Sequence, residues 1–266
     1  MSKERLPALL ALALPVLAGL GWMAFAGAPP LYLAINAGAL AIGSAWVTFG
    51  RLPAGAAPRR ALAIGLVALF ALPLLSGSEV NGITRWIPLG PLPLHSGMLT
   101  LPLLLVLAAR QRDDAPPLLL AALLVALLQP DAASAFAVTF ACVGLHHVSQ
   151  DWRMGAVAIM GFFAAIAAAL RGELPAQQFV ERVLVAAAFD QPLAALGLFG
   201  ALAAGFLLML FAAPMPRAER FALAGTLFGF SAAAMMSNYP SALIGFGAGP
   251  ILGYALGLAA REESMR

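Results

Sequence analysis

Charged residues are scarce in this chain, where Asp, Glu, Lys and Arg make up only 10% of 266 residues. A soluble domain carries about a quarter charged residues, so a soluble globular protein is excluded. Hydrophobic residues reach 62% and the mean hydropathy is +0.92. The composition therefore indicates a polytopic membrane protein with all-α, helical-bundle architecture.

Cysteine and histidine are almost absent as well. Cys142 is the single cysteine and lies in an apolar run, which excludes a disulfide framework and a cysteine-based metal site. The pair His146-His147 has no third ligand at a metal-binding spacing, and we interpret it, like His95, as interfacial. No metal site is therefore expected. The fifteen basic residues form no run, so we expect no nucleic-acid partner and instead read them as topology signals.

What the sequence does contain is a succession of apolar runs. A helix of roughly 20 residues crosses a hydrocarbon core, and somewhat shorter runs can also span it. The runs lack the period-two alternation of strands and are rich in Leu and Ala. They predict a single transmembrane domain, residues 1–266, with ten helices at Leu6–Ala26, Leu31–Gly50, Ala61–Leu75, Met98–Ala109, Pro116–Leu128, Ala132–Val148, Gly155–Leu170, Leu193–Ala213, Phe221–Met236 and Ala242–Ala260. The basic start resembles a secretory signal, but the further runs favour an uncleaved first helix.

The distribution of Lys and Arg predicts the orientation of these helices. If both termini are cytoplasmic, twelve basic residues lie inside and three, Arg85, Arg171 and Arg182, lie outside. Basic residues are retained on the cytoplasmic side, so this arrangement is favoured. The sizeable outside loops are then Ser76–Gly97 and Arg171–Pro192. We expect a multi-pass membrane protein in contact with membrane lipids.

The outside loops combine carboxylates with arginines. Arginine binds phosphate oxygens bidentately, and a partly desolvated carboxylate can act as a general base. This combination suits an anionic, lipid-linked substrate. The alternative is that these groups merely solvate the ends of the loops.

Three motifs carry a resemblance to a known family. The first is Asn81-Gly82-Ile83-Thr84-Arg85-Trp86-Ile87-Pro88-Leu89-Gly90, the second is Gln129-Pro130-Asp131, and the third, more degenerate, runs from Tyr239-Pro240 to Gly249. In this order they resemble the signatures of the SEDS family (FtsW, RodA and SpoVE), whose members have ten spans and both termini inside. The resemblance covers nearly the whole chain.

The resemblance implies a peptidoglycan glycosyltransferase that polymerises lipid II and works with a class B penicillin-binding protein. The family needs an Asp in the outside loop before the eighth span, and Asp190 is the nearest positional match in this chain. The family also carries a Glu–Lys pair after the first motif. Here the chain reads Leu94-His95-Ser96-Gly97 and Thr100 instead.

The candidate site residues follow from these motifs, and each has a structural alternative. Asp190 is the candidate catalytic base, helped by a cation or an arginine at the departing pyrophosphate, or else it caps the eighth helix. Asp131 is a substrate contact or the N-cap of the sixth helix. Arg85 is a pyrophosphate contact or an interfacial residue that satisfies loop carbonyls. The remaining candidates for substrate binding are Asn81, Trp86, Gln129, Arg171 and Arg182. A divalent cation is left open.

Two further patterns predict local structure. Residues Gln177–Ala188 are expected to form an amphipathic helix on the outer leaflet. Gly245, Gly249, Gly253 and Gly257 recur every four residues and predict close helix packing, with Gly245 and Gly249 in the loop before Pro250. Three functions stay open at this stage: a SEDS-like enzyme, a non-catalytic SEDS relative that binds a lipid-linked precursor or a cell-wall partner, and a small lipid flippase or transporter.

Overall fold

The computed structural model describes residues 3–76, 79, 81–90, 92–172 and 174–260. Each of the ten apolar runs contains a helix, which confirms the all-α, polytopic bundle. These helices are α1 (Leu6–Phe25), α2 (Pro30–Phe49), α3 (Ala56–Ala71), α5 (Ser96–Arg110), α6 (Ala115–Leu128), α7 (Ala132–Ser149), α8 (Trp152–Ala169), α10 (Pro192–Leu207), α11 (Arg217–Met236) and α12 (Ala248–Leu258). Shorter elements are η1 (Lys3–Arg5), α4 (Pro73–Ser76), α9 (Val183–Asp190) and the π-helical turn η2 (Leu208–Ala212).

Six segments of the described chain are long and apolar enough to cross a membrane on their own. They are α1, α2, α3 continued to Ser76, α7, α8 and α10 continued to Ala212. Helices α5, α6 and α12 are apolar but shorter, and α11 carries Arg217, Glu219 and Arg220 in its first turn. The multi-pass class is therefore confirmed, while ten crossings stay a prediction.

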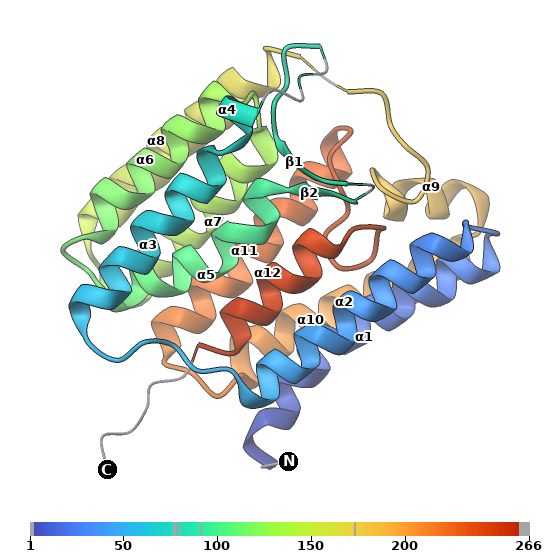
Figure 1. Ribbon diagram of the computed structural model, residues 1–266, viewed down its shortest axis with the longest axis horizontal. Helices are drawn as coiled ribbons and strands as arrows, with labels where there is room; N and C mark the ends of the chain where they lie inside the picture. Colours follow the sequence, from blue (N-terminus) through green and yellow to red (C-terminus); the bar gives the residue numbers. More distant parts are fainter. Residues whose placement is uncertain (1–2, 77–78, 80, 91, 173, 261–266) are drawn as a thin grey trace.

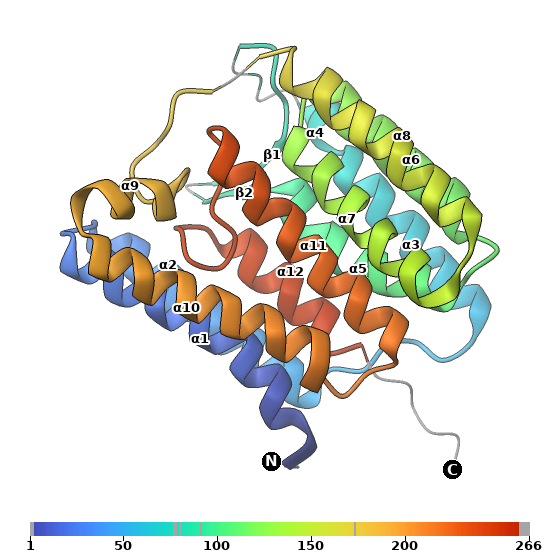
Figure 2. The same cartoon turned by 180° about the vertical axis from the view of Figure 1, so that it is seen from behind.

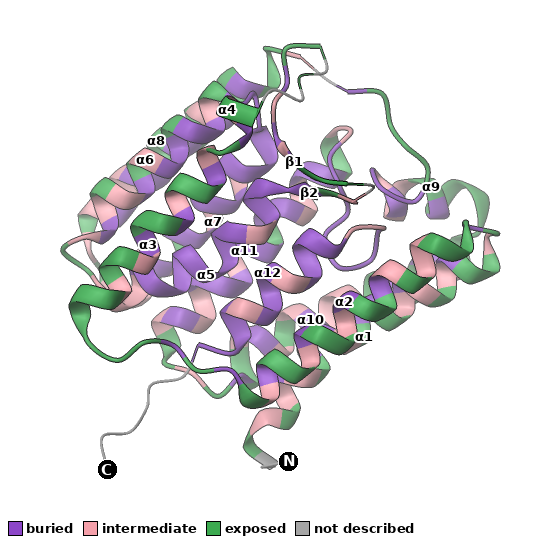
Figure 3. Ribbon diagram, viewed as in Figure 1, coloured by how far each residue is buried: buried purple, intermediate pink, exposed green. Residues whose placement is uncertain are grey.

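Helices α5, α7, α11 and α12 form the centre of the bundle, and the other helices surround them (Figures 1 and 2). Helix α7 packs on α8 and α11, while α5 packs on α3, α11 and α12. The buried residues concentrate in these central helices, and the outer helices turn exposed faces outward (Figure 3). Exposed large apolar side chains such as Phe49, Phe163 and Phe211 fit a surface that faces lipid.

Glycines allow the central helices to approach closely. A Cβ atom added at Gly253 of α12 would lie 2.1 Å from the carbonyl oxygen of Met98 on α5, and one at Gly229 of α11 would lie 2.4 Å from that of Phe136 on α7. The predicted packing role of the glycine stripe is thus confirmed at Gly253. Gly245 precedes the helix as expected, but Gly249 lies inside α12, because the helix begins at Ala248.

The start of α1 and the end of α12 lie at one end of the bundle, opposite the hairpin and α9 (Figure 1). At the end of the bundle where α1 starts and α12 ends, a buried ion pair joins α5 to α11. Arg110 donates from Nε to Glu219 Oε1 at 2.8 Å and from Nη2 to Oε2 at 2.9 Å. Nη2 also donates to the carbonyl oxygen of Ala260 at 2.6 Å. One side chain therefore holds α5, α11 and the segment that follows α12 together.

The first motif folds into a turn followed by a two-stranded hairpin. Asn81 and Gly82 both take positive φ values, 53° and 78°, and form a tight turn, which suits the conformational preferences of these two residue types. Strands β1 (Trp86–Leu89) and β2 (Leu92–His95) pair antiparallel, with Trp86 opposite His95 and Pro88 opposite Pro93. Proline has no backbone N–H and cannot donate a hydrogen bond between strands. Because Pro88 and Pro93 face each other, neither lies opposite an N–H group that would lack its partner.

Candidate functional site

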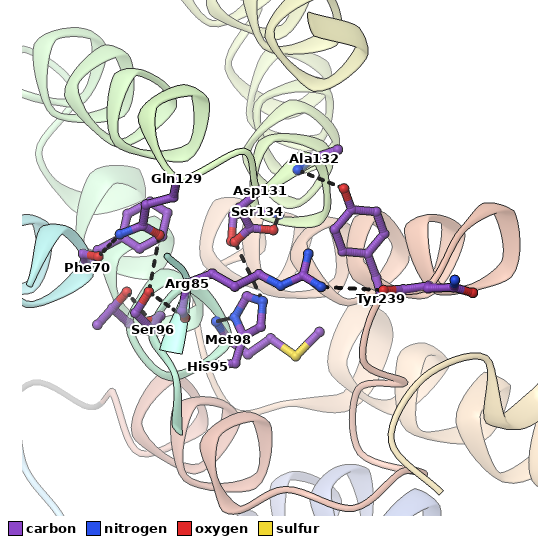
Figure 4. A network of polar contacts seen from close by, with 12 residues as sticks. Phe70, Arg85, His95, Ser96, Met98, Gln129, Asp131, Ala132, Ser134 and Tyr239 are labelled. Atoms are coloured by element: carbon purple, nitrogen blue, oxygen red, sulfur yellow. Dashed lines mark hydrogen bonds and ion pairs between the residues drawn. The ribbon is translucent and has the colours of Figure 1, made fainter. Parts of the chain in front are cut away.

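A buried polar network lies where the hairpin meets α5 and α7 (Figure 4). Arg85 is 1% exposed, and its guanidinium carbon lies 4.7 Å from the ring centre of Tyr239. Its Nη2 donates to the carbonyl oxygen of Asn238 at 3.5 Å, whereas its Nε is buried without a hydrogen-bond partner. The interpretation of Arg85 as an interfacial group satisfying loop carbonyls therefore holds in part, but the side chain is fully buried.

Gln129 connects this network to α3. Its Nε2 donates to the carbonyl oxygen of Phe70 at 2.6 Å, and its Oε1 accepts from Ser96 Oγ at 3.4 Å. Ser96 also bonds to the carbonyl oxygen of Arg85 through its backbone N–H, at 3.0 Å, and through its hydroxyl, at 3.2 Å. The Gln129 amide thus braces the hairpin against the helices.

Asp131 is the N-cap of α7, as one of its two interpretations predicts. Its Oδ1 accepts from the backbone N–H of Ser134 at 3.2 Å, and its Oδ2 accepts from the Ser134 hydroxyl. The same Oδ2 lies 3.6 Å from His95 Nε2. Asp131 is 0% exposed, so its charge is available only to groups inside the protein.

His95 is a member of the site that the sequence did not indicate, because only an interfacial position was expected of it. The side chain is 1% exposed, and Nδ1 accepts from the backbone N–H of Met98 at 3.3 Å, which caps α5. With Nδ1 as acceptor, the neutral ring carries its proton on Nε2, the nitrogen that faces Asp131. Burial lowers the pKa of His95 to about 4, opposed by the charge of Asp131 and reinforced by that of Arg85.

This shift predicts how stability depends on pH. In the unfolded chain, His95 is protonated below its ordinary pKa of 6.5. In the folded protein, it stays neutral until the pH approaches 4. The free energy of unfolding should therefore fall by roughly 3 kcal/mol as the pH drops across this interval. Unfolding of the wild type and of His95→Gln, measured in detergent between pH 7.5 and pH 4, should show a steeper loss in the wild type. Parallel curves would contradict the assignment.

Asp190 lies apart from this network, in an open cleft of about 670 Å³. The cleft lies beside α9 and the ends of α1 and α10, and its lining includes Glu181, Arg182, Asp190 and Asn238. Asp190 is the last residue of α9 and is exposed. The alternative interpretation, that Asp190 caps the eighth helix, is wrong, because the N-cap residue of α10 is Gln191 and no side chain caps it.

Arg182 shares the cleft with Asp190. Its φ of 51° is left-handed, and its backbone N–H donates to the carbonyl oxygen of Tyr239 at 3.4 Å. Its Nε is buried without a hydrogen-bond partner. The amphipathic helix expected over Gln177–Ala188 is wrong in its bounds: turns lead up to Arg182, and α9 begins only at Val183.

The other site candidates are scattered. Trp86 lines a second cavity beside the cleft. Asn81 is exposed in its turn, and Arg171 is exposed and donates from Nη1 to the carbonyl oxygen of Leu127 at 2.6 Å. The structure thus brings Arg85, Gln129 and Asp131 into one buried network, and Asp190 and Arg182 into one open cleft.

Glu181 lies beside these groups and is a member of the site to which the sequence assigned no separate role. Its side chain is buried, at 6% exposure, yet it belongs to the lining of the cleft. Burial raises the pKa of its carboxyl, while the N–H of Gln177 and the charge of Arg85 oppose that rise. A sequence signal existed, since Glu181 directly precedes Arg182, one of the three basic residues on the outside face.

Comparison with known proteins gives a match in fold rather than in sequence. No family model matches the chain, and no curated protein matches it. The rod shape determining protein RodA of Thermus thermophilus, as a single-residue mutant, aligns with a TM-score of 0.68 at 24% identity, over 97% of this chain and 96% of that chain. Another RodA structure from the same organism gives 0.64 at 24% identity, over 95% and 93% of the two chains.

A third match comes from a structure described as the structural coordination of polymerization and crosslinking by a peptidoglycan synthase complex. It has a TM-score of 0.65 at 20% identity and covers 97% of both chains. The chain therefore has the RodA fold over nearly its whole length. The resemblance to the SEDS family, drawn from the three motifs, is confirmed at the level of the fold.

Proposed function

We propose that this chain is a SEDS-family protein of the bacterial cytoplasmic membrane that polymerises lipid II into glycan strands. The observation that carries the proposal is the open cleft, in which a carboxylate, Asp190, and a cationic group, Arg182, face the same space in a RodA-like fold. Glycosyl transfer from a lipid pyrophosphate needs these two groups, a base for the acceptor and positive charge for the leaving group.

In this reaction the acceptor sugar binds with one hydroxyl against Asp190. The carboxylate takes the hydroxyl proton while the oxygen forms a bond to the anomeric carbon of the donor sugar. The bond between that carbon and the pyrophosphate oxygen breaks, and the lipid pyrophosphate leaves with the electron pair. Arg182 stabilises the charge that develops on the leaving group.

The described residues contain no group of three His, Cys, Asp or Glu side chains that could hold a metal ion. We assign no step of the reaction to a divalent cation.

The third structural match belongs to a peptidoglycan synthase complex. This supports a class B penicillin-binding protein as the partner of the chain, supplying the crosslinking activity beside its polymerisation.

A second function, binding of lipid II without turnover, is favoured by the start of α5. Gly97 and Thr100 put no charge where the family carries its Glu–Lys pair. Gly97 has no side chain, and Thr100 donates its hydroxyl to the carbonyl oxygen of Ser96 within the same helix.

Incubation of the purified protein with fluorescent lipid II, alone and with a class B penicillin-binding protein, tests both functions. Polymerisation is expected, seen as a ladder of glycan strands on a gel. Binding of lipid II without any ladder would overturn the enzymatic proposal in favour of the second function. Absence of both binding and ladder would overturn both.

A further inference from the structure

A second cavity, of about 300 Å³, opens on the same face as the cleft. Its walls come from three separate segments: the hairpin, the loop before α9 and the loop before α12. The residues that matter to its chemistry are Trp86, Pro88, Pro93, Pro175, Phe246 and Glu181. The lining is thus dominated by flat or rigid apolar surfaces, with one carboxylate among them.

The aromatic walls are held in place by their neighbours. The rings of Trp86 and His95 meet edge to face, with centroids 5.1 Å apart and planes at 79°. Phe246 stacks on Tyr32 with centroids 3.7 Å apart and planes at 5°. These contacts restrict both rings, so a ligand that binds here does not have to order them.

Glu181 is the single charged residue among the described residues that line this cavity. Its Oε2 accepts from the backbone N–H of Gln177 at 2.8 Å. A carboxylate offers about four lone-pair positions, so this buried carboxylate has acceptor capacity beyond the N–H of Gln177. A ligand with hydroxyl groups can fill that capacity with charge-assisted hydrogen bonds.

The lining also excludes other ligands. Within the described part of the chain no Lys or Arg lines the cavity, and its one charge is negative, so a pyrophosphate would be repelled. A purely apolar ligand, such as a lipid tail, would leave the carboxylate desolvated without a donor. The chemistry that satisfies the site is a flat, uncharged ring with apolar C–H bonds on its face and hydroxyls at its edge.

We infer that this cavity is a saccharide subsite, which binds one pyranose ring with its C–H face against Trp86 and the prolines and a hydroxyl donated to Glu181. The inference rests on the proposed function, and it assigns the glycan and the pyrophosphate of the substrate to two different cavities. Glu181 and Gln177 line both cavities, so a sugar held here lies next to the cleft that contains Arg182 and Asp190. The pyrophosphate belongs in the cleft, and the glycan in the subsite.

Binding of the disaccharide N-acetylglucosaminyl-N-acetylmuramic acid with its carboxyl group amidated, so that it is uncharged, and without lipid or pyrophosphate, tests the subsite. Calorimetry and indole fluorescence of the full chain in detergent should show saturable binding. Loss of the charge-assisted bond should weaken the affinity about tenfold to a hundredfold in Glu181→Ala. Glu181→Gln keeps an acceptor for Gln177 and should weaken it less. Trp86→Phe should remove the fluorescence change and weaken binding.

Trp152→Phe is the matched control, because Trp152 is 75% exposed at the start of α8 and lines neither cavity. It should bind the disaccharide as the wild type does. Unchanged affinity in both Glu181→Gln and Trp86→Phe would overturn the subsite, as would an absence of binding by the wild type.

The subsite and the proposed function fail in different ways. Disaccharide binding that depends on Glu181 and Trp86, in a protein that makes no glycan strands, would leave the subsite standing and remove the enzymatic function. Polymerisation with the same KM for lipid II in Glu181→Gln as in the wild type would support the enzymatic function and overturn the subsite.

Discussion

Replacement of Asp190 by asparagine is expected to reduce the rate of lipid II polymerisation by a factor on the order of 10² to 10⁴. The amide keeps the size of the side chain but cannot take a proton from the acceptor hydroxyl, and a positioned general base contributes an effect of this magnitude. The loss should appear in kcat, because the amide would still offer hydrogen bonds to the substrate. Strand formation is measured from fluorescent lipid II on a gel.

The stability of this variant should stay close to that of the wild type. Asp190 is exposed and caps no helix, and surface substitutions of this kind change the unfolding free energy by about 0.5 kcal/mol or less. Glu79→Gln provides the control, since Glu79 is an exposed acid that lines neither cavity. Full activity of Asp190→Asn beside full activity of the control would show that the base is another group.

Replacement of Arg110 by alanine is expected to destabilise the fold by about 3–5 kcal/mol. The side chains of Arg110 and Glu219 are only 8% and 4% exposed, so the variant leaves a carboxylate buried without the guanidinium that it faces. It also removes the donor to the carbonyl oxygen of Ala260. The free energy of unfolding in mixed detergent micelles measures the effect.

The pair Arg60 and Asp114 offers a matched control. It has the same bidentate geometry, at 2.8 and 2.6 Å, but its side chains are 59% and 28% exposed. Arg60→Ala should therefore cost about 1 kcal/mol or less. The double variant Arg110→Leu with Glu219→Leu should recover stability relative to Arg110→Ala. Equal losses in Arg110→Ala and Arg60→Ala would contradict the role assigned to burial.

The helices could be predicted from the sequence because lipid leaves the backbone no partner outside the helix itself. Every apolar run therefore contains a helix. The errors in the predicted helices concern the residues at which helices begin and end, and the bounds of α9. Helix α9 was misplaced because several backbone groups of Gln177–Arg182 form hydrogen bonds with distant residues instead of continuing a helix. The carbonyl oxygens of Phe179 and Val180, for example, accept from Phe246 and Ser241. Such long-range partners leave no periodic trace in the sequence.

The hairpin was missed for a related reason. Each strand is four residues long and contains a proline, which ordinarily argues against a strand. Only the register, in which Pro88 faces Pro93, makes the pairing permissible. A register is a relation between two segments, and neither segment reveals it alone.

The site itself was half predictable. The charge bias identified Arg85 and Arg182 as exceptions, and the motif order identified Asp131, because both are properties of the chain in one dimension. The burial of Arg85, the contact of His95 with Asp131 and the place of Glu181 between two cavities depend on which loops meet. Hydropathy and motif spacing carry no information about that meeting.

The loop that carries Glu181 lines both cavities, and this shared lining has a thermodynamic consequence. Four hydrogen bonds tie the loop of Glu181 to the loop before α12: Ser241 N–H to Val180 O, Phe246 N–H to Phe179 O, Arg182 N–H to Tyr239 O, and Val183 N–H to Ser241 Oγ. A ligand that displaces this loop in one cavity also reshapes the other cavity. Occupancy of the two sites is then reciprocal: whatever factor a bound sugar applies to pyrophosphate affinity, a bound pyrophosphate applies to sugar affinity.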